Sequence, residues 1–248
     1  MSDFSVIIPA RYGSTRLPAK ALADIGGKPL IWHVAQRALD SNASQVIIAT
    51  DDQRIMEAVK DIECEAVMTS AVHQSGSDRL AEVVTMKAMA KDHIVVNVQG
   101  DEPTIPPKLI NEVAQKLADN PAAVMATAAK QIDQVDDIEN PNVVKVVTDL
   151  QDRALYFSRA PIPHDRDQCG PASAWHHIGI YAYRAGFLQQ FTELAPSPLE
   201  LKESLEQLRV LEQGETIMVH KIDYDAGVGV DTEADLERAR DIMQSRAW

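Results

Sequence analysis

The chain has 248 residues, with 24 Lys and Arg against 37 Asp and Glu, and its formal net charge of −13 excludes phosphate-backbone binding as its main function, because nucleic-acid-binding proteins present a basic face. Hydrophobic residues (45%) and charged residues (25%) occur in the proportions of a folded protein rather than a disordered one. We expect a soluble cytoplasmic protein without membrane insertion. No stretch approaches the roughly 18–20 apolar residues of a membrane span, and no signal-peptide pattern opens the chain. The two isolated cysteines fit neither a disulfide framework nor a zinc site.

Short apolar runs alternate with helical patterns through the first half of the chain. The predicted strands are 5–8, 46–50, 65–68 and 94–98, and the predicted helices are 28–40, 53–60, one beginning near Ser77, and 107–119. Strands buried on both faces are continuous apolar runs, and helices between them imply right-handed parallel crossovers. The pattern therefore predicts an α/β fold, doubly wound around a mostly parallel sheet.

The second half of the chain changes character. Its predicted elements are two β-rich stretches at 143–147 and 178–183 around a Pro-, Asp- and Arg-rich loop at 159–171, a helix at 199–213, a strand at 217–219 and a helix from about Thr232, a plausible N-cap, to Ser245. Strand-rich material of this kind often builds a lobe that closes over a substrate or pairs with a second subunit. We expect one α/β domain over residues 1–248, with a smaller β-rich lobe at about 130–190.

A glycine-containing loop with three cations follows the first strand. Residues 4–23 contain no Asp or Glu, whereas the composition of the chain would place about three there. Arg11, Arg16 and Lys20 form a cationic island, and 13–15 (Gly-Ser-Thr) lets backbone N–H groups approach a ligand closely. In an open α/β sheet, ligands bind at the carboxyl ends of the strands. The loop therefore predicts a phosphate site, although neither G-x-x-x-x-G-K-[ST] nor G-x-G-x-x-G occurs.

Three further segments carry candidate functional residues. Asp101 lies in Gln-Gly-Asp-Glu-Pro after strand 94–98, where a carboxylate could hold Mg²⁺ on a triphosphate or simply belong to a turn. Asp231 precedes the last helix, where it could also lie near the N-cap. The segment 74–79 is a polar glycine turn entering a helix, and its simpler interpretation is a capping turn with Arg79 exposed.

Together these segments resemble the 3-deoxy-manno-octulosonate cytidylyltransferases, also called CMP-Kdo synthetases. The resemblance runs in order through 10–20, 74–79, 98–103, 140–147, 154–160, 177–181, 205–209 and 229–232. It implies a fold like that of the nucleotide-diphospho-sugar transferases and the reaction of CTP with 3-deoxy-D-manno-octulosonate (Kdo) to give CMP-Kdo and pyrophosphate, for lipopolysaccharide biosynthesis. It further implies Mg²⁺ as cofactor and a homodimer formed through the β-rich lobe.

The resemblance also implies roles for individual residues. The implied CTP-binding residues are Ala10, Arg11, Gly13, Ser14, Thr15, Arg16, Lys20, Ser75, Gly76 and Arg79. Asp101 and Asp231 match the family's Mg²⁺ ligands, and with Arg11 and Lys20 they make up the catalytic set. The implied sugar-binding residues are Gln99, Arg159, His177, Tyr181, Glu206 and Gln207. Arg159 is the natural partner, by charge, of the sugar carboxylate. Ser77 departs from the family's more common threonine but keeps the hydroxyl, and 167–175 matches no pattern of the family.

Two other functions compete with this interpretation. The same fold and chemistry could serve another acceptor, such as an amino derivative of Kdo or a sialic acid; the sugar-contact set favours Kdo. A catalytically silent nucleotide-sugar-binding protein would have lost a metal carboxylate or a phosphate-binding cation, yet Asp101, Asp231, Arg11 and Lys20 are all present. The resemblance therefore implies an enzyme that transfers a cytidylyl group in line from CTP, a reaction that depends on positioning and charge neutralisation.

Overall fold

The computed structural model describes residues 3–13, 17–167 and 174–245. Its strands are β1 (Phe4–Ala10), β2 (Asp24–Ile25), β3 (Lys28–Pro29), β4 (Gln45–Thr50), β5 (Glu65–Met68), β6 (Ile94–Asn97), β7 (Met125–Gln131), β8 (Lys145–Thr148), β9 (Ala154–Ser158), β10 (Trp175–Arg184) and β11 (Ile217–Ile222). Its helices are the 3₁₀ turn η1 (Lys20–Leu22), α1 (Leu30–Leu39), α2 (Gln53–Ala58), α3 (Gly76–Met86), α4 (Pro107–Ala118), α5 (Val135–Glu139), α6 (Ala185–Glu193), α7 (Pro198–Glu203), α8 (Gln207–Glu212) and α9 (Glu233–Ser245).

Nine of the strands form one mixed sheet. The order is β11-β7-β10-β6-β1-β4-β5, with β8 paired to β10 and β9 paired to β8. β1 runs parallel to β4 and β6, β4 to β5, and β7 to β11, whereas β10 runs antiparallel to β6 and β7. Parallel neighbours need crossover connections, which the helices between them supply. The predicted doubly wound α/β fold is confirmed.

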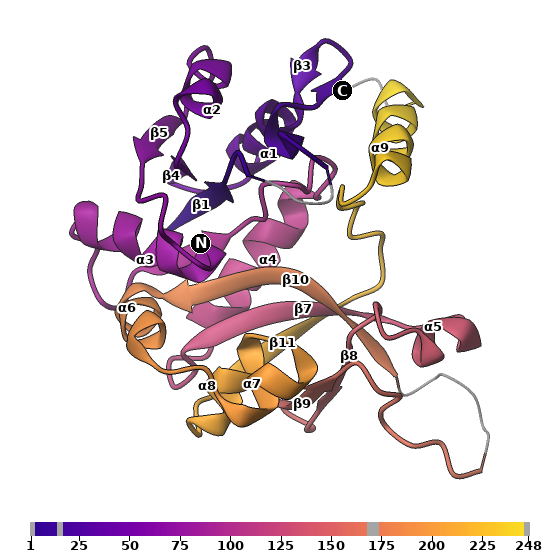
Figure 1. The fold of residues 1–248 in the computed structure, drawn as a ribbon. Coiled ribbons are helices and arrows are strands. Elements are labelled where there is room, and N and C mark those ends of the chain that lie inside the picture. The colour runs from indigo at the N-terminus through magenta and orange to yellow at the C-terminus, as the bar shows by residue number, and fades with distance from the viewer. Residues whose placement is uncertain (1–2, 14–16, 168–173, 246–248) are drawn as a thin grey trace.

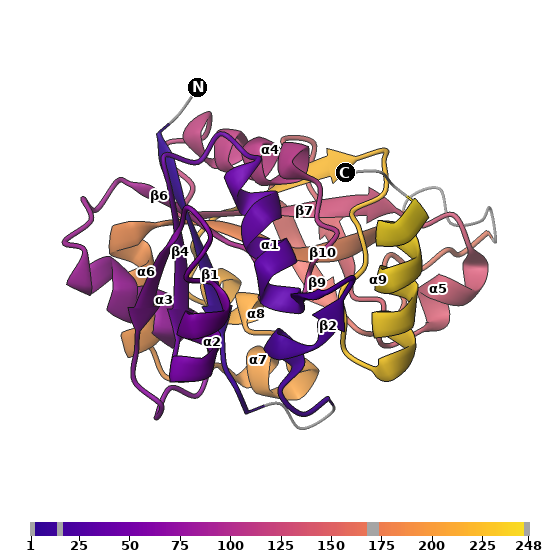
Figure 2. The same ribbon diagram turned by 90° about the horizontal axis from the view of Figure 1, so that it is seen from above.

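Helices cover both faces of the sheet, and a hydrophobic core fills each interface. On one face, α1, α4 and α9 pack with alternate residues of β1, including Val6 and Ile8. On the other face, α3, α6 and α8 pack with Ile7. Figure 1 shows β7 and β10 between α4 behind and α7 and α8 in front, and Figure 2 shows the same layers from above. This layering leaves the carboxyl ends of β1, β4 and β6 together at one edge.

An antiparallel ribbon extends the sheet near the start of β10. β8 pairs with Trp175 and His176 of β10, and β9 pairs with β8 from Ser158 to Ala154. These strands fall inside the lobe predicted at 130–190. That this region behaves as a lobe remains a prediction.

The structure corrects the helix predicted at 199–213, which is divided into α7 and α8. Ser204, between them, has a left-handed backbone with φ 53°. The carbonyls of Glu203 and Ser204 accept hydrogen bonds from Arg159. The left-handed Ser204 ends α7, α8 begins at Gln207, and Arg159 satisfies the carbonyls left free at the break. Among the helices that the structure describes, none is long and apolar enough to cross a membrane.

Candidate active site

A polar cavity of about 280 Å³ lies where the carboxyl ends of β1 and β6 meet the start of α3. Nine residues predicted to act on substrate or metal line it: Ala10, Arg11, Lys20, Ser75, Gly76, Arg79, Gln99, Asp101 and Asp231. Gly13 is outside the cavity lining, and Ser14, Thr15 and Arg16 lie outside the described residues. The cavity therefore unites the cationic loop, the glycine turn and both candidate metal carboxylates.

Gly100 allows the segments after β1 and β6 to meet. A Cβ atom at this position would lie 2.5 Å from the carbonyl oxygen of Pro9, closer than atoms can pack. The absence of a side chain therefore lets the backbone carrying Asp101 approach the backbone carrying Ala10 and Arg11. The glycine before Asp101 has a packing role in addition to a turn role.

Lys20 joins the two candidate metal carboxylates. Its Nζ lies 2.6 Å from Asp101 Oδ2 and 3.0 Å from Asp231 Oδ1. Burial alone would lower the pKa of Lys20, but charge attraction and hydrogen bonds from the two carboxylates outweigh it and raise that pKa. The backbones are joined as well, since Val230 N–H donates to the carbonyl of Asp101 at 2.8 Å. A residue pair 130 positions apart in the chain thus forms one anionic centre around an ammonium.

Asp231 lies beside the N-cap of α9, as the sequence allowed, and its N–H donates to the Asp235 carboxylate at 3.2 Å. Thr232 is the capping residue of α9: its hydroxyl oxygen accepts the N–H of Asp235 at 3.3 Å, and the Asp235 carboxylate accepts the N–H of Thr232 at 2.9 Å. The predicted N-cap at Thr232 is confirmed. The carboxylate of Asp231 instead faces Lys20 and the cavity.

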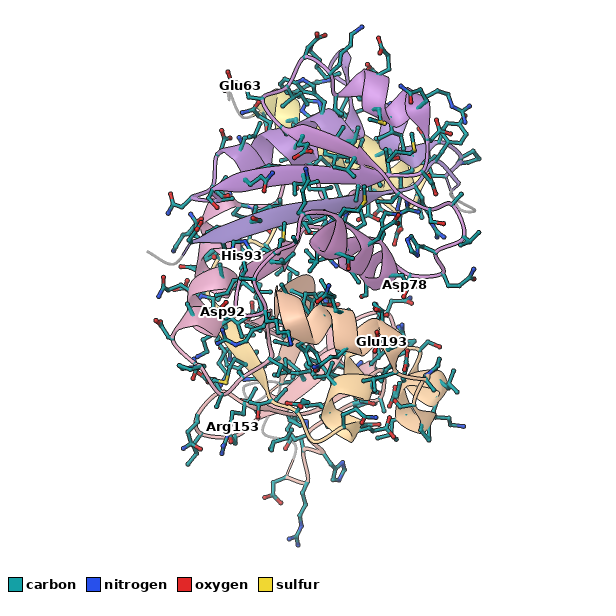
Figure 3. All side chains as sticks on the ribbon, turned by 90° about the vertical axis from the view of Figure 1, so that its left-hand side faces the viewer. Glu63, Asp78, Asp92, His93, Arg153 and Glu193 are labelled. Atoms are coloured by element: carbon teal, nitrogen blue, oxygen red, sulfur yellow. The ribbon has the colours of Figure 1, made fainter. Side chains whose placement is uncertain are left out.

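The glycine turn at 74–79 is both a capping turn and a cavity wall. Ser75 caps α3 in a reciprocal pair with Asp78, which is labelled in Figure 3. Arg79 is only 4% exposed, so the alternative of an exposed Arg79 is wrong. Its guanidinium donates to Thr69 Oγ1 and, at 2.8 Å, to Asp51 Oδ2.

Asp51 is a supporting residue that sequence reasoning missed. It follows β4 directly, and besides Arg79 it accepts the backbone N–H of Tyr12 at 3.3 Å. Its only sequence signal was its position at the end of a predicted strand beside the cationic loop. Through these two bonds Asp51 fixes the loop after β1 relative to α3.

The remaining predicted sugar residues lie outside the cavity lining but in connected structure. His177 is 7% exposed, its Nε2 is 3.0 Å from Thr127 Oγ1, and its ring centroid is 5.4 Å from that of Tyr181. Burial lowers the pKa of His177 to about 3, so the ring is neutral at pH 7. Tyr181 pairs across the sheet with Asn97, two residues before Gln99, which links this aromatic cluster to the cavity wall.

Glu206 and Gln207 reach the same region from α8. The Glu206 carboxylate accepts the hydroxyl of Ser77, in α3, at 2.9 Å. Burial raises the pKa of Glu206. Gln207 is 4% exposed. The hydroxyl that Ser77 shares with the family's threonine therefore connects the sugar set to the helix that begins at the cavity.

Arg159 is held by backbone carbonyls. Its Nε donates to Glu203 O at 2.8 Å, its Nη1 to Pro141 O at 2.9 Å, and its Nη2 to Ser204 O at 3.4 Å. The Glu203 carboxylate in turn accepts the N–H of Arg159 at 2.9 Å and the hydroxyl of Ser158 at 2.7 Å. Glu203, which the sequence reasoning also missed, therefore organises the segment that carries Arg159.

Asp101 and Asp231 fit the donor requirements of Mg²⁺. Within the ranges 3–13, 17–167 and 174–245, no group of three or more His, Cys, Asp or Glu side chains could hold a metal. Mg²⁺, however, is commonly bound by one or two carboxylates together with substrate phosphates and waters. Two carboxylates that converge on one cation, at the wall of a polar cavity, meet that requirement.

The chain is similar to known cytidylyltransferases over most of its length. A family model described as "Cytidylyltransferase" matches residues 5–217. The 3-deoxy-manno-octulosonate cytidylyltransferase of Idiomarina loihiensis is 55% identical over 96% of this chain and 97% of its own. The enzyme of the same name from Acidovorax ebreus is 52% identical over 98% of each chain. A solved structure described as CMP:2-keto-3-deoxy-manno-octonic acid synthetase complexed with CTP is 44% identical, with a TM-score of 0.92 over 98% of this chain and 99% of its own.

Proposed function

The chain belongs to the family of 3-deoxy-manno-octulosonate cytidylyltransferases, and from this premise we propose that it transfers the cytidylyl group of CTP to Kdo, giving CMP-Kdo and pyrophosphate. The observation that carries the proposal is the likeness, at 44% identity over almost the whole chain, to a synthetase solved with CTP. Kdo is favoured over an amino derivative or a sialic acid because relatives that are 52–55% identical are named 3-deoxy-manno-octulosonate cytidylyltransferases.

The cationic side of the cavity suits the triphosphate of CTP. Arg11 and Lys20 supply positive charge on an otherwise acidic protein, and the backbone after β1 is held close by Gly100 and Asp51. Ser75, Gly76 and the buried Arg79 form the wall that we assign to the cytidine. Because Arg79 and the backbone after β1 are held in place before substrate binds, this part of the cavity needs little reorganisation to accept the nucleotide.

The sugar residues would present the attacking hydroxyl. The anomeric oxygen of Kdo forms a bond to the α-phosphorus while the bond from that phosphorus to the pyrophosphate oxygen breaks, and pyrophosphate leaves. Gln99 lies at the junction of the cavity and the sugar set, and Arg159 would pair with the Kdo carboxylate. We propose Asp101 and Asp231 as the residues that hold Mg²⁺, which when bound supplies Lewis-acid charge neutralisation at the phosphates.

The proposal extends to the setting of the enzyme. It includes a role in the biosynthesis of lipopolysaccharide, of which Kdo is a component. It also includes a cytoplasmic location, where CTP is available, and a homodimer formed through the β-rich lobe. Support for the homodimer comes from Leu155, Leu199 and Leu201, which are exposed on β9 and α7.

Pyrophosphate release tests the proposed reaction directly. The purified protein is incubated with Mg²⁺ and each of CTP, UTP, ATP and GTP, with and without Kdo. We expect release only when CTP and Kdo are both present. Turnover with another acid sugar but not with Kdo would overturn the acceptor, and absence of turnover with intact CTP binding would favour a non-catalytic binding protein.

A further inference from the structure

The Lys20 ammonium lies between the carboxylates of Asp101 and Asp231, the two residues proposed to hold a metal. Its Nζ contacts both Asp101 and Asp231, and its side chain is only 17% exposed. A divalent cation on the same two carboxylates would lie against the ammonium in a partly buried site, where repulsion between the two is weakly screened. Charge repulsion therefore favours departure of the ammonium when a metal occupies the carboxylates.

The backbone around these residues is fixed, so the movement falls to the lysine side chain. Lys20 N–H donates to Leu17 O at 3.1 Å, and Ala23 N–H donates to Lys20 O at 3.0 Å. Arg240, in α9, donates to Asp24 O at 2.7 Å, which ties the helix after Asp231 to β2, after Lys20 (Figure 2). A lysine has a flexible four-carbon stem and a compact charge, and it can therefore exchange partners without moving these elements.

We propose that Lys20 couples metal binding to nucleotide binding: its ammonium occupies the carboxylate pair until a triphosphate offers it another anion, and its departure would free Asp101 and Asp231 to hold a divalent metal. The inference rests on the proposed function for the identity of the nucleotide. Lys20 and Arg11 line the same cavity. A triphosphate bound there would therefore offer its oxygens to the Lys20 ammonium. A group that bridges the metal ligands in one state and the substrate in the other makes metal and substrate bind with positive coupling.

The decisive variant is Lys20→Met, which keeps the length of the side chain and removes the ammonium. Mn²⁺ binding without nucleotide is measured by electron paramagnetic resonance for the wild type, Lys20→Met, and Lys20→Met combined with Asp101→Asn. We expect Lys20→Met to bind Mn²⁺ about tenfold or more tightly than the wild type, a gain within the usual range of coupling between sites. The gain should disappear in the double variant.

A matched charge control is Lys108→Met. Lys108 lies on α4, its side chain is 67% exposed, and its Nζ is 3.5 Å from Glu112. Removing this ammonium lowers the charge of the protein by the same amount but should leave Mn²⁺ affinity at the wild-type value. An equal gain in both variants would mean that net charge, and not the bridge, sets the affinity, and would overturn the proposal.

The coupling itself is measured with CTP in the absence of sugar. The dissociation constant of CTP is determined by calorimetry with EDTA and with saturating Mn²⁺. Because coupling is reciprocal, the ratio of the two constants should be about tenfold smaller for Lys20→Met than for the wild type. Unchanged Mn²⁺ affinity in Lys20→Met, or a gain that persists with Asp101→Asn, would overturn the role of Lys20 even if pyrophosphate release confirms the reaction. The predicted Mn²⁺ gain in a protein that does not turn over CTP and Kdo would instead refute the proposed function alone.

Discussion

Asp51 fixes two walls of the polar cavity without lining it. One carboxylate oxygen accepts the N–H of Tyr12 and the other accepts the guanidinium of Arg79. Because Arg79 is almost fully buried, loss of Asp51 leaves a buried cation without its counter-charge. We expect Asp51→Ala to lower the free energy of unfolding by about 3–5 kcal/mol, in the range for breaking a buried ion pair, and to weaken CTP binding in the molecules that remain folded.

Urea denaturation and CTP titration check these two effects together. The neighbouring Asp52 provides the control: it caps α2 and pairs with Arg54, whose side chain is 58% exposed. Asp52→Ala should reduce stability less and should not lower CTP affinity to the same degree. If Asp51→Ala bound CTP as tightly as the wild type at a temperature where both are folded, the supporting role of Asp51 would be wrong.

His177 makes the protein sensitive to acid. Burial depresses its pKa in the folded state to about 3, against about 6.5 in the unfolded chain. Between these values the unfolded chain binds the additional proton, so the free energy of unfolding falls as the pH decreases below 6.5. From pH 7 to pH 5 this one group should remove about 2 kcal/mol of stability, because a pH unit corresponds to about 1.36 kcal/mol.

The variant His177→Gln isolates this contribution. Glutamine can still bond to Thr127, but it does not titrate. We expect the loss of stability between pH 7 and pH 5, measured by urea denaturation, to be about 2 kcal/mol smaller in the variant than in the wild type. The same pH dependence in both proteins would show that His177 is protonated without loss of the fold.

At the scale of elements, Gly100 governs the junction of β1 and β6. Any side chain there meets the carbonyl of Pro9, and neither backbone segment can give way without moving Arg11 or Asp101. We expect Gly100→Ala to destabilise the protein by about 1–3 kcal/mol, as overpacking does, and to reduce turnover strongly. Gly179, in β10, is the control, because a Cβ there meets nothing within 4 Å. Thermal unfolding and pyrophosphate release compare the two; equal, small effects would refute the close-approach argument.

The sequence predicted elements well where a local pattern determines them. Strand β1 and helices α1 and α4 appear near their predicted positions because continuous apolar runs and helical periods arise from the same burial that forms the core. The division of the helix at 199–213 was not predicted: it occurs at the left-handed Ser204, and the carbonyls of Glu203 and Ser204 bond to Arg159, some 45 positions earlier. The helical period of a segment carries no information about a hydrogen-bond partner that lies so far away in the sequence.

At the scale of the whole molecule, the cavity arises from strand order. The glycine loop, the segment at 74–79 and Asp101 each carried a local signal, and a parallel sheet brings such segments to one edge. That Lys20 meets Asp231, 211 positions away, follows from the path of the chain between β11 and α9 and from no feature of either residue. Asp51 and Glu203 were missed because their partners, Arg79 and Tyr12 for Asp51 and Ser158 and Arg159 for Glu203, lie far away in the sequence and form no local motif with them.

The proposed homodimer is tested at β9, the strand at the exposed edge of the sheet. Among the described strands β9 pairs along its length only with β8, and Leu155 on it is 60% exposed. Leu201, on α7, is 68% exposed. A second copy could cover these apolar side chains and the unpaired strand edge, which in a lone chain favours non-specific association. Light scattering should therefore give twice the chain mass of 27.3 kDa for the wild type and the mass of a single chain for Leu155→Glu.

Met86→Glu is the control for this variant: it adds the same charge on α3, at a 55% exposed site, and should remain dimeric. A monomeric wild type would remove the homodimer from the proposal, and a dimeric Leu155→Glu would move its interface away from β9.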